Sequence, residues 1–379
     1  MRILHLLYTQ GVAGAEKHLL DLLPELKKHD IDCQLLCISS PKATTSIKEY
    51  CDQMSKKGIK TTLLIAKSKL SFLSAAKQIS VYLKSNQIHI VHSHLFNADL
   101  ITVLVKKIYI QTLTILSTKH GYEEKYLLQT GLGNRKIRYN AYYFISRWII
   151  KQIDHNLAVS RAISDLYYHL KFDKRRIKYV HHGIAIPSIN GKVKPLKGNP
   201  KILMVGRFMQ IKGHIYLIQA LPELIKKFPE LKLILAGDGP IKDNLMAIAN
   251  SLNVLDHIEF AGFTSPQLYT SQCQLMVLPS LFESFGLVYI ESFALKIPVV
   301  AFDTQAANEI IEHNKTGILV EKEDVQALVE KIIYLLESPE ERKRLAENAY
   351  QRFKTYYNVE RMGRETIEWY RSVLKPDEE

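Results

Sequence analysis

Two glutamates eight positions apart, Glu283 and Glu291, flank a turn that could bind a phosphate. The residues between them, Ser284-Phe285-Gly286-Leu287, predict a turn that opens a helix. A helix N-terminus carries unsatisfied N–H groups and partial positive charge, and Gly286 would let a phosphate approach the backbone closely. One carboxylate precedes the helix and one lies inside it, so a diphosphate at the helix start could have a carboxylate on each side. Because carboxylates accept hydrogen bonds from sugar hydroxyls, this layout indicates a nucleotide-sugar site.

A second group of residues could neutralise the same diphosphate. Val205-Gly206-Arg207 ends an apolar run, and Lys212-Gly213 precedes a predicted helix. Ligands of open α/β sheets bind beyond the carboxyl ends of the strands. Two cations at such a position would stabilise a diphosphate leaving group. The alternative is a pair of surface cations in an ordinary strand-to-helix loop.

Alternating strands and helices must position these residues. Short apolar runs predict strands, and most are separated by segments with helical spacing, which is typical of parallel sheets with helices on both faces. In the first half the runs are Arg2–Tyr8, Asp32–Ile38, Thr61–Ile65, Ile88–His92, Thr114–Ser117 and Asn156–Val159. In the second half they are Ile202–Val205, Leu233–Ala236, Ile258–Phe260, Leu275–Leu278, Val299–Phe302 and Ile318–Val320. The second set is nearly continuous in apolar residues, as buried parallel strands should be.

Length and charge limit the classes of function. The chain has 379 residues, enough for two or three domains, and a net charge of +13. Residues 1–185 hold 28 Lys and Arg against 13 Asp and Glu, a net of +15, and the remainder has a net of −2. This asymmetry indicates a polyanionic partner for the first half, such as anionic lipid, a lipid diphosphate or nucleic acid. The alternative is a lysine-rich surface without such a partner.

Together these motifs resemble those of retaining glycosyltransferases of family 4. The segment from Gln274 to Asp303 resembles the E-x7-E signature of that family, and Arg207 to Gly213 resembles its G-R-x4-K-G motif. The resemblance implies the α/β GT-B fold, with two Rossmann-like domains whose parallel sheets face each other across a cleft. It implies an acceptor-binding domain at 1–186, a linker at 187–200 and a nucleotide-sugar-binding domain at 201–358. It also implies that a C-terminal helix within 359–379 packs back on the first domain.

The resemblance also assigns roles to individual residues. Arg207 and Lys212 would hold the donor diphosphate, Glu283 would face the donor sugar, and Glu291 would hold the ribose diol. Phe285, Gly286 and Leu287 would bind the donor at the helix start, and residues Phe260–Phe263 would contact the base. His120, in Thr118-Lys119-His120-Gly121, would point at the donor sugar and diphosphate. Gly14, in Gly11-Val-Ala-Gly14-Ala-Glu16, resembles the glycine pair of the family, whose first glycine is Ala13 here.

We expect no metal cofactor. Asp30-Ile31-Asp32 has the form of the metal motif of the other major glycosyltransferase fold, but it begins a predicted strand, where solvated acids in a turn are the better interpretation. His89, His92 and His94 could suggest a metal site, and strand alternation would place His92 and His94 on one face. The family often has a histidine pair at this strand end without metal.

Two further features bear on location. The sequence begins in a strand-like run, which favours a cytoplasmic location. No C-x-x-C pair is formed by the four cysteines, Cys33, Cys37, Cys51 and Cys273, so we expect free thiols in a reducing compartment. The segment 135–151 is basic and aromatic, and it could lie at the cytoplasmic face of a membrane or pack on its own sheet.

The resemblance implies a metal-independent enzyme that moves a hexosyl group from a nucleoside-diphosphate sugar, with UDP-sugars favoured, and retains the anomeric configuration. The acceptor would be a hydroxyl of a glycan or lipid-linked molecule in cell-surface polysaccharide, lipopolysaccharide or glycolipid synthesis, and the leaving diphosphate would help deprotonate it. One alternative is a nucleotide-sugar 2-epimerase on the same fold. Another is a non-catalytic polyanion-binding protein. We expect no nucleic-acid partner.

Overall fold

The computed structural model describes residues 1–66, 72–122, 141–172, 177–186, 199–263 and 272–374. The chain divides into two compact units, the first comprising Met1–Gly183 with Val359–Glu379 and the second Ile184–Asn358. The stretch that we predict as the linker, 187–200, lies outside the described residues except for its last two positions.

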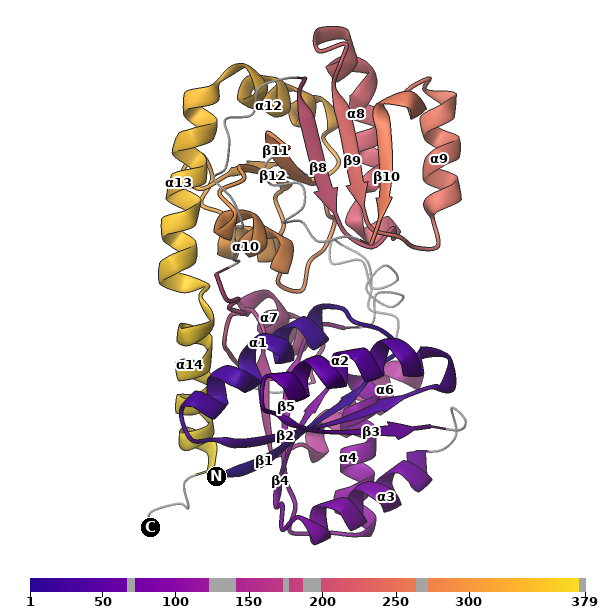
Figure 1. The fold of residues 1–379 in the computed structure, drawn as a ribbon, viewed down its shortest axis with the longest axis vertical. Helices are drawn as coiled ribbons and strands as arrows, with labels where there is room; N and C mark the ends of the chain where they lie inside the picture. Colours follow the sequence, from indigo (N-terminus) through magenta and orange to yellow (C-terminus); the bar gives the residue numbers. More distant parts are fainter. Residues whose placement is uncertain (67–71, 123–140, 173–176, 187–198, 264–271, 375–379) are drawn as a thin grey trace. The chain divides into compact units, whose positions relative to one another are not determined.

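The first unit is a seven-stranded parallel sheet in the order β3-β2-β1-β4-β5-β6-β7 (Figure 1). Its strands are β1 (Arg2–Tyr8), β2 (Asp32–Ser39), β3 (Lys60–Ile65), β4 (Ile90–His94), β5 (Thr114–Lys119), β6 (His155–Ala158) and β7 (Lys178–Tyr179). Its helices are α1 (Gly14–Lys28), η1 (Pro41–Ala43), α2 (Thr44–Lys56), α3 (Phe72–Ser85), α4 (Phe96–Ile108), α6 (Ala141–Gln152), α7 (Arg161–His169) and α14 (Val359–Leu374).

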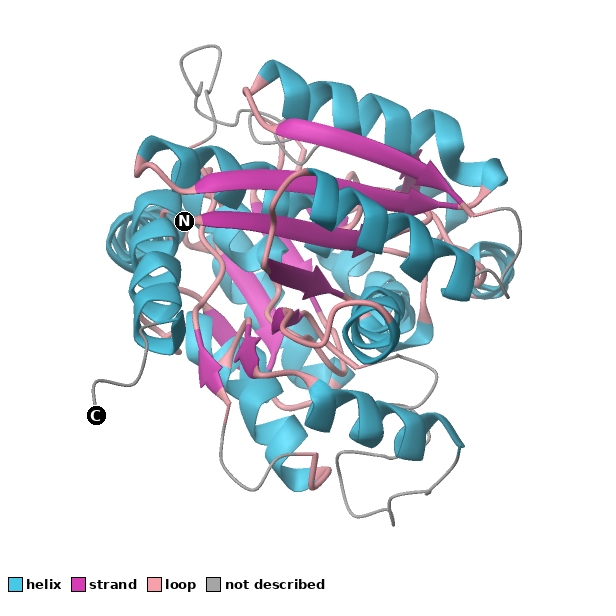
Figure 2. Cartoon of the chain, turned by 90° about the horizontal axis from the view of Figure 1, so that it is seen from below, coloured by secondary structure: helices cyan, strands magenta, loops and turns pink. Residues whose placement is uncertain are grey.

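Strand alternation divides the core of the first unit into two layers. Ile3 and Leu7 of β1 join the cluster that contains α1, α2 and α14, whereas Leu4 and Leu6 join the cluster that contains α3, α4 and part of α6. Helices cover both faces of the strands (Figure 2). The position between Ile3 and Leu7 is His5, so the face that carries α1 and α14 also receives this buried histidine.

The second unit is a six-stranded parallel sheet in the order β10-β9-β8-β11-β12-β13. Its strands are β8 (Lys201–Val205), β9 (Lys232–Ala236), β10 (Ile258–Gly262), β11 (Leu275–Leu278), β12 (Val299–Phe302) and β13 (Ile318–Val320). Its helices are η2 (Gln210–Lys212), α8 (His214–Lys227), α9 (Lys242–Ser251), η3 (Leu255–His257), α10 (Leu287–Ala294), α11 (Gln305–Ile310), α12 (Val325–Glu337) and α13 (Pro339–Tyr356).

Both sheets reverse their strand order at one point. The reversal lies between β1 and β4 in the first unit and between β8 and β11 in the second. The carboxyl ends of the two strands at a reversal diverge into loops on opposite sides of the sheet, which leaves a crevice for ligands. The residues that follow β8 and β11 are those of the two predicted donor motifs, so the topology brings the motifs to one place.

Helix α14 belongs to the first unit although it ends the described chain. It lies beside α1 (Figure 1), and Trp369 and Tyr370 are buried in the same cluster as Leu22 and Leu26 of α1. Arg361 donates to the carbonyl of His181, at 2.7 Å, which ties the start of the helix to the loop after β7.

Candidate active site

The loop after β8 is fixed against the loop after β11. Gly213 has a φ of +69°, and a Cβ at this position would lie 1.8 Å from the carbonyl oxygen of Pro279. The backbone N–H of Leu281 donates to the carbonyl of Ile211 at 2.8 Å. Only a glycine allows so close an approach of two backbones. The contact holds Lys212 next to the segment that carries Glu283.

Lys212 and Glu283 form an ion pair. The Lys212 ammonium donates to both oxygens of Glu283, at 2.7 and 2.8 Å, and the Ser280 hydroxyl donates to Glu283 Oε1 at 2.9 Å. Their side chains are 27% and 13% exposed, respectively. The sequence predicts both residues as donor ligands but does not predict that they contact each other.

Helix α10 begins as predicted, between the two glutamates. Gly286 caps it with a φ of +90°, and a Cβ there would lie 2.4 Å from the ring of Tyr289. Leu287 is its first residue, and Glu291, its fifth, is partly buried. The Phe285 side chain is buried against Tyr357, with ring centroids 6.1 Å apart. Phe285 could therefore reach a ligand only through its backbone.

Arg207 has an exposed guanidinium, and within the described ranges no ion pair involves it. It follows Gly206 directly after β8, so it lies at the same sheet edge as Lys212. The site thus combines one exposed cation, one cation shared with a carboxylate, and the N-terminus of a helix. This arrangement can bind a diphosphate.

Two buried polar groups lie around the pair. Burial and the Glu283 carboxylate raise the pKa of the Tyr289 hydroxyl, which therefore stays protonated. Burial and the Lys212 charge lower the pKa of His214 to about 3. The His214 ring packs on Phe208 with centroids 4.9 Å apart. His214 is therefore neutral at neutral pH.

In the first unit, Gly14 is the first residue of α1. The preceding residue, Ala13, has a φ of −136° in the extended region, so the backbone here does not need the first glycine of the family pair. The Ala13 N–H donates to Glu16 Oε2 at 2.8 Å. The chain's own carboxylate thus already satisfies one of the N–H groups at this helix start.

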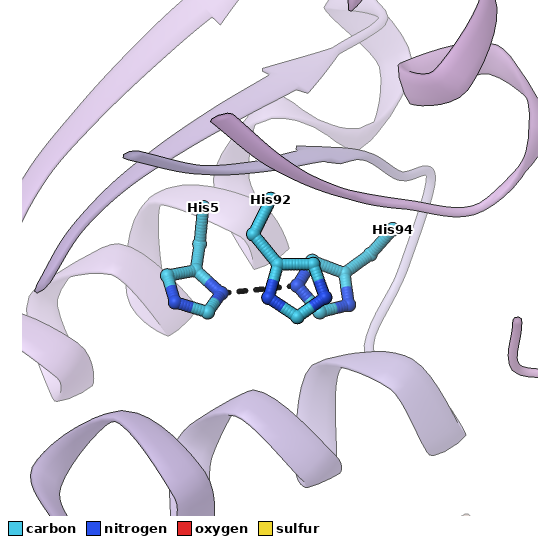
Figure 3. Close-up of side chains that lie close together, drawn as sticks. All are labelled: His5, His92 and His94. Atoms are coloured by element: carbon cyan, nitrogen blue, oxygen red, sulfur yellow. Dashed lines mark hydrogen bonds between the residues drawn. The ribbon is translucent and has the colours of Figure 1, made fainter. Parts of the chain in front are cut away.

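His120 follows β5, is partly buried, and contacts a cluster of buried histidines that the sequence does not predict as a whole. His120 Nε2 lies 3.0 Å from His94 Nδ1. His94 Nε2 in turn lies 3.0 Å from His5 Nδ1, a contact that Figure 3 shows. Burial lowers the pKa of all three imidazoles, that of His5 to about 3. His120 Nδ1 is buried and has no hydrogen-bond partner in the described chain.

Strand register explains part of this cluster. His5 pairs with His92 across β1 and β4, and His94 pairs with Thr118 across β4 and β5. The predicted common face of His92 and His94 is confirmed, because their rings stack with centroids 4.6 Å apart. His18 and His182 extend the cluster, with their Nδ1 atoms 2.6 Å apart.

The opposite face of β4 and β5 holds a buried charged network. Lys119 donates to Asp99 at 2.6 Å and to Ser117 at 2.8 Å, and Ser93 and Ser117 each donate to the other oxygen of Asp99. Both charged side chains are less than a tenth exposed. Lys119 is adjacent to His120 in sequence, so this network fixes the end of β5 and with it the start of the His120 loop.

The two candidate metal motifs lie at the start of β2 and around β4. Asp30 lies in a turn with a φ of +60°, and Asp32 accepts from Arg2 at 2.6 Å at the start of β2. His89 is exposed. Among the described residues, one group of three potential ligands is His5, His92 and His94, whose ligand atoms lie within 4.8 Å of one another. The absence of a metal cofactor stays a prediction.

The described part of the basic, aromatic segment, 141–151, lies in α6, and residues 135–140 lie outside the described residues. Tyr143 and Ile149 are buried, whereas Phe144, Ile145 and Trp148 are 59%, 46% and 46% exposed. The helix thus packs one face on its own sheet and leaves an apolar face exposed. In the described part of the chain, no helix is long and apolar enough to cross a membrane. All four cysteines are buried and free of disulfides.

Two family models cover most of the chain. The model for glycosyltransferase family 4 matches residues 12–186, and that for glycosyl transferases group 1 matches residues 187–352. The two matches meet within four residues of the boundary between the structural units.

Individual relatives agree with the family. The chain is 32% identical over 181 residues to the alpha-D-kanosaminyltransferase of Streptomyces kanamyceticus, covering 47% of each protein. It is 28% identical over 211 residues to the N-acetylgalactosamine-N,N'-diacetylbacillosaminyl-diphospho-undecaprenol 4-alpha-N-acetylgalactosaminyltransferase of Campylobacter jejuni, covering 55% of this chain and 57% of that one. The matches to these relatives thus span about half of their length.

The fold is also similar to solved structures. Anabaena HepE in complex with UDP and glucose superposes with a TM-score of 0.80 at 20% identity, covering 98% of this chain and all of that one. The strand order of both sheets and this similarity identify the GT-B fold. From its motifs, its fold and the two family matches, the chain belongs to glycosyltransferase family 4, the glycosyl transferases of group 1.

Proposed function

We propose that this glycosyltransferase transfers a hexosyl group from a nucleoside-diphosphate sugar, with UDP-sugars favoured, and retains the anomeric configuration. The observation that carries the proposal is the arrangement of Arg207, the Lys212–Glu283 pair and the start of α10 at the carboxyl ends of β8 and β11. HepE, which has the same fold, is described in complex with UDP and glucose.

Arg207 and Lys212 would bind the diphosphate of the donor. An ammonium group has three N–H donors, and two of those of Lys212 already reach Glu283. A third remains for a phosphate oxygen, so Lys212 can bind the diphosphate and keep Glu283 in place. The exposed Arg207 guanidinium can bind a phosphate in a bidentate way. Both charges stabilise the diphosphate as it leaves, which removes the need for a metal ion.

The two glutamates would have different roles. Glu283 precedes the helix and lies on the sugar side of the diphosphate, where it would stabilise the positive charge that develops on the sugar ring. Glu291 lies inside α10 and would accept from the ribose hydroxyls. The N–H groups of Phe285, Gly286 and Leu287 would bind phosphate oxygens at the helix start.

The first unit would bind the acceptor and supply His120. As the resemblance implies, His120 would contact the donor sugar or diphosphate, and its Nδ1 atom has no hydrogen-bond partner in the described chain. Gly14 would allow a ligand to approach the start of α1.

The acceptor that we propose is lipid-linked, as in the synthesis of cell-surface polysaccharide, lipopolysaccharide or glycolipid. Residues 1–185 carry a net charge of +15, and α6 exposes Phe144, Ile145 and Trp148 next to Lys151. An apolar helix face beside cations is typical of peripheral contact with an anionic membrane, here on its cytoplasmic face. The Campylobacter relative is named for a diphospho-undecaprenol acceptor.

Vesicle binding tests the membrane contact. We expect binding to anionic vesicles that weakens with salt, because surface attraction is screened within a Debye length of ~8 Å at physiological ionic strength. Trp148→Ser should reduce binding, whereas Tyr334→Ser, which changes an equally exposed aromatic residue in the second unit, should not. Equal binding to neutral and anionic vesicles, or no binding, would exclude the proposed contact.

A thermal-shift panel of UDP, GDP and ADP tests the donor. A ligand that binds only the native state adds ~2.7 kcal/mol of stability at a hundredfold excess over its dissociation constant. We expect the largest shift with UDP. NMR of the donor sugar with and without an acceptor then tests the reaction. A sugar that changes in the absence of acceptor would favour the 2-epimerase, and an inverted product would contradict the retaining mechanism.

A further inference from the structure

A continuous chain of hydrogen bonds runs through the first unit from Thr118 to His120. Its links are Thr118 Oγ1 to His92 Nε2 at 2.7 Å, His92 Nδ1 to Tyr370 Oη at 2.7 Å, and Tyr370 Oη to His5 Nε2 at 3.4 Å. It continues from His5 Nδ1 to His94 Nε2 and from His94 Nδ1 to His120 Nε2, both at 3.0 Å. Figure 3 shows the link between His5 and His94.

Each imidazole in the chain is neutral. His5, His92 and His94 have no exposed surface, and burial is the largest cause that lowers their pKa values and that of His120. A neutral imidazole has one N–H and one lone pair. An imidazole that accepts at one nitrogen must therefore donate at the other, which couples the bond directions along the histidines. The Tyr370 hydroxyl has one proton and can also accept from both neighbours, so three arrangements exist: two in which every bond runs the same way, and one in which His92 and His5 both donate to Tyr370.

The two directions differ in what they leave unpaired. If Thr118 donates to His92, then His92 donates to Tyr370, Tyr370 to His5, His5 to His94, and His94 to His120. The one group left over is the N–H at His120 Nδ1. In the opposite direction both the Nδ1 lone pair and the Thr118 hydroxyl proton are left over, because His92 is the one hydrogen-bond partner of the Thr118 side chain in the described chain. Each direction thus leaves one donor unpaired, and the second also leaves the Nδ1 lone pair. The arrangement in which Tyr370 accepts from both sides leaves its own proton and the same lone pair. One additional unpaired buried group disfavours both of these by about tenfold or more.

We propose that Thr118 and Tyr370 fix His120 as the Nδ1–H tautomer, so that His120 presents an N–H donor to an oxygen of the substrate. That the oxygen belongs to the donor sugar or its diphosphate rests on the proposed function, whereas the tautomer follows from the hydrogen bonds alone. His120 is the residue that touches the ligand. Tyr370, His5, His92 and His94 are positioning residues, and Tyr370 makes α14 part of the site although it lies 250 positions from His120.

Tyr370→Phe tests this inference because it cuts the chain in the middle and keeps the buried ring. Without the hydroxyl, each direction of the remaining His5–His94–His120 segment leaves one N–H and one lone pair unpaired, one at each end. The two tautomers of His120 should then be about equally populated. Tyr143→Phe is the matched control, since it removes another buried hydroxyl of the same unit, which donates to the carbonyl of Leu170.

The measurement is the NMR tautomer analysis of the full chain labelled with ¹⁵N-histidine, without any substrate. We expect a single Nδ1–H tautomer of His120 in the wild type and in Tyr143→Phe, and a mixture in Tyr370→Phe. An Nε2–H tautomer in the wild type would overturn the inference, and so would a Tyr370→Phe protein with unchanged tautomers. Stoichiometric metal on His5 and His94 in the purified protein would also overturn it, because a metal would occupy the ring nitrogens.

Kinetics then connect the tautomer to the ligand. If only the Nδ1–H form binds, halving its population should lower kcat/KM about twofold in Tyr370→Phe and leave Tyr143→Phe unchanged. A mixed tautomer with an unchanged kcat/KM would contradict the role of His120 toward the substrate but not the tautomer assignment. The failure of the proposed function and the failure of this inference can thus be told apart.

Discussion

The Lys212–Glu283 pair should be coupled more strongly than an exposed pair of the same chemistry. The second unit contains such a control, Lys296–Glu347, in which the nitrogen and oxygen are also 2.7 Å apart. The side chains of Lys212 and Glu283 are 27% and 13% exposed, whereas those of Lys296 and Glu347 are 48% and 47% exposed. The perturbation is a double-mutant cycle for each pair, with Lys→Met and Glu→Gln.

The expected magnitude follows from this difference in exposure. Hydrogen bonds between charged groups contribute ~1.5–3 kcal/mol when solvent is largely excluded, and Lys212 makes two of them to Glu283. Partial desolvation offsets some of the gain, so we expect a coupling free energy of about 2 kcal/mol for Lys212–Glu283. Exposed pairs contribute ~0–1 kcal/mol, so we expect about 0.5 kcal/mol for Lys296–Glu347.

The assay must report on the second unit. Both tryptophans of the chain, Trp148 and Trp369, belong to the first unit, so their fluorescence is unsuitable. Hydrogen exchange of the β8 and β11 amides, measured by mass spectrometry in mild denaturant, reports the free energy of opening of the unit that holds both pairs. Equal couplings for the two pairs, or a coupling near zero for Lys212–Glu283, would refute the reasoning.

Three further predictions concern the site and its surroundings. Glu283→Ala should lower kcat on the order of a hundredfold with little change in donor affinity, whereas Glu291→Ala should mainly weaken donor binding. Calorimetry measures the donor affinity and initial rates measure kcat. The reverse pattern would mean that the two glutamates have exchanged roles. Transfer should survive a strong chelator, and activity that vanishes and returns with a divalent cation would contradict the metal-independent site. The free energy of unfolding should decrease as the pH is lowered from 6.5 to about 3. Burial lowers the pKa of His5 and His18 to about 3, so the unfolded state binds more protons than the folded state in this pH range. Each such histidine contributes a slope of up to ~1.4 kcal/mol per pH unit, measured by denaturation at several pH values, and a flat profile would mean that the histidines are charged in the fold.

The sequence predicts the strands well because buried parallel strands are short continuous apolar runs. Leu275–Leu278, Val299–Phe302 and Ile318–Val320 have the predicted bounds, and the terminal helix, Val359–Leu374, lies within the predicted range 359–379. The strand that ends at His94 is shifted by two residues from its predicted position, since a histidine pair in a buried strand has no apolar signal.

The contacts within the site are harder to predict. The pairing of Lys212 with Glu283 joins residues 71 positions apart and depends on the approach of Gly213 to Pro279. Strand alternation could have placed His5 on the face of His92 and His94, because β1 is central and its odd positions share that face. Nothing in the local sequence indicates that Tyr370 joins them, because that contact depends on how α14 packs.

Calorimetric titration of UDP into the wild type, Arg207→Gln and Lys331→Gln tests the central claim most directly. Arg207 is the exposed cation at the end of β8, and Lys331 is an exposed cation on α12, remote in sequence from both donor motifs. A charge-assisted hydrogen bond to phosphate contributes ~1.5–3 kcal/mol, so Arg207→Gln should weaken UDP binding by about ten- to a hundredfold. Lys331→Gln should bind UDP as the wild type does. If neither UDP nor another nucleoside diphosphate binds the wild type, or if Arg207→Gln binds UDP with unchanged affinity, the second unit does not hold the donor as we propose.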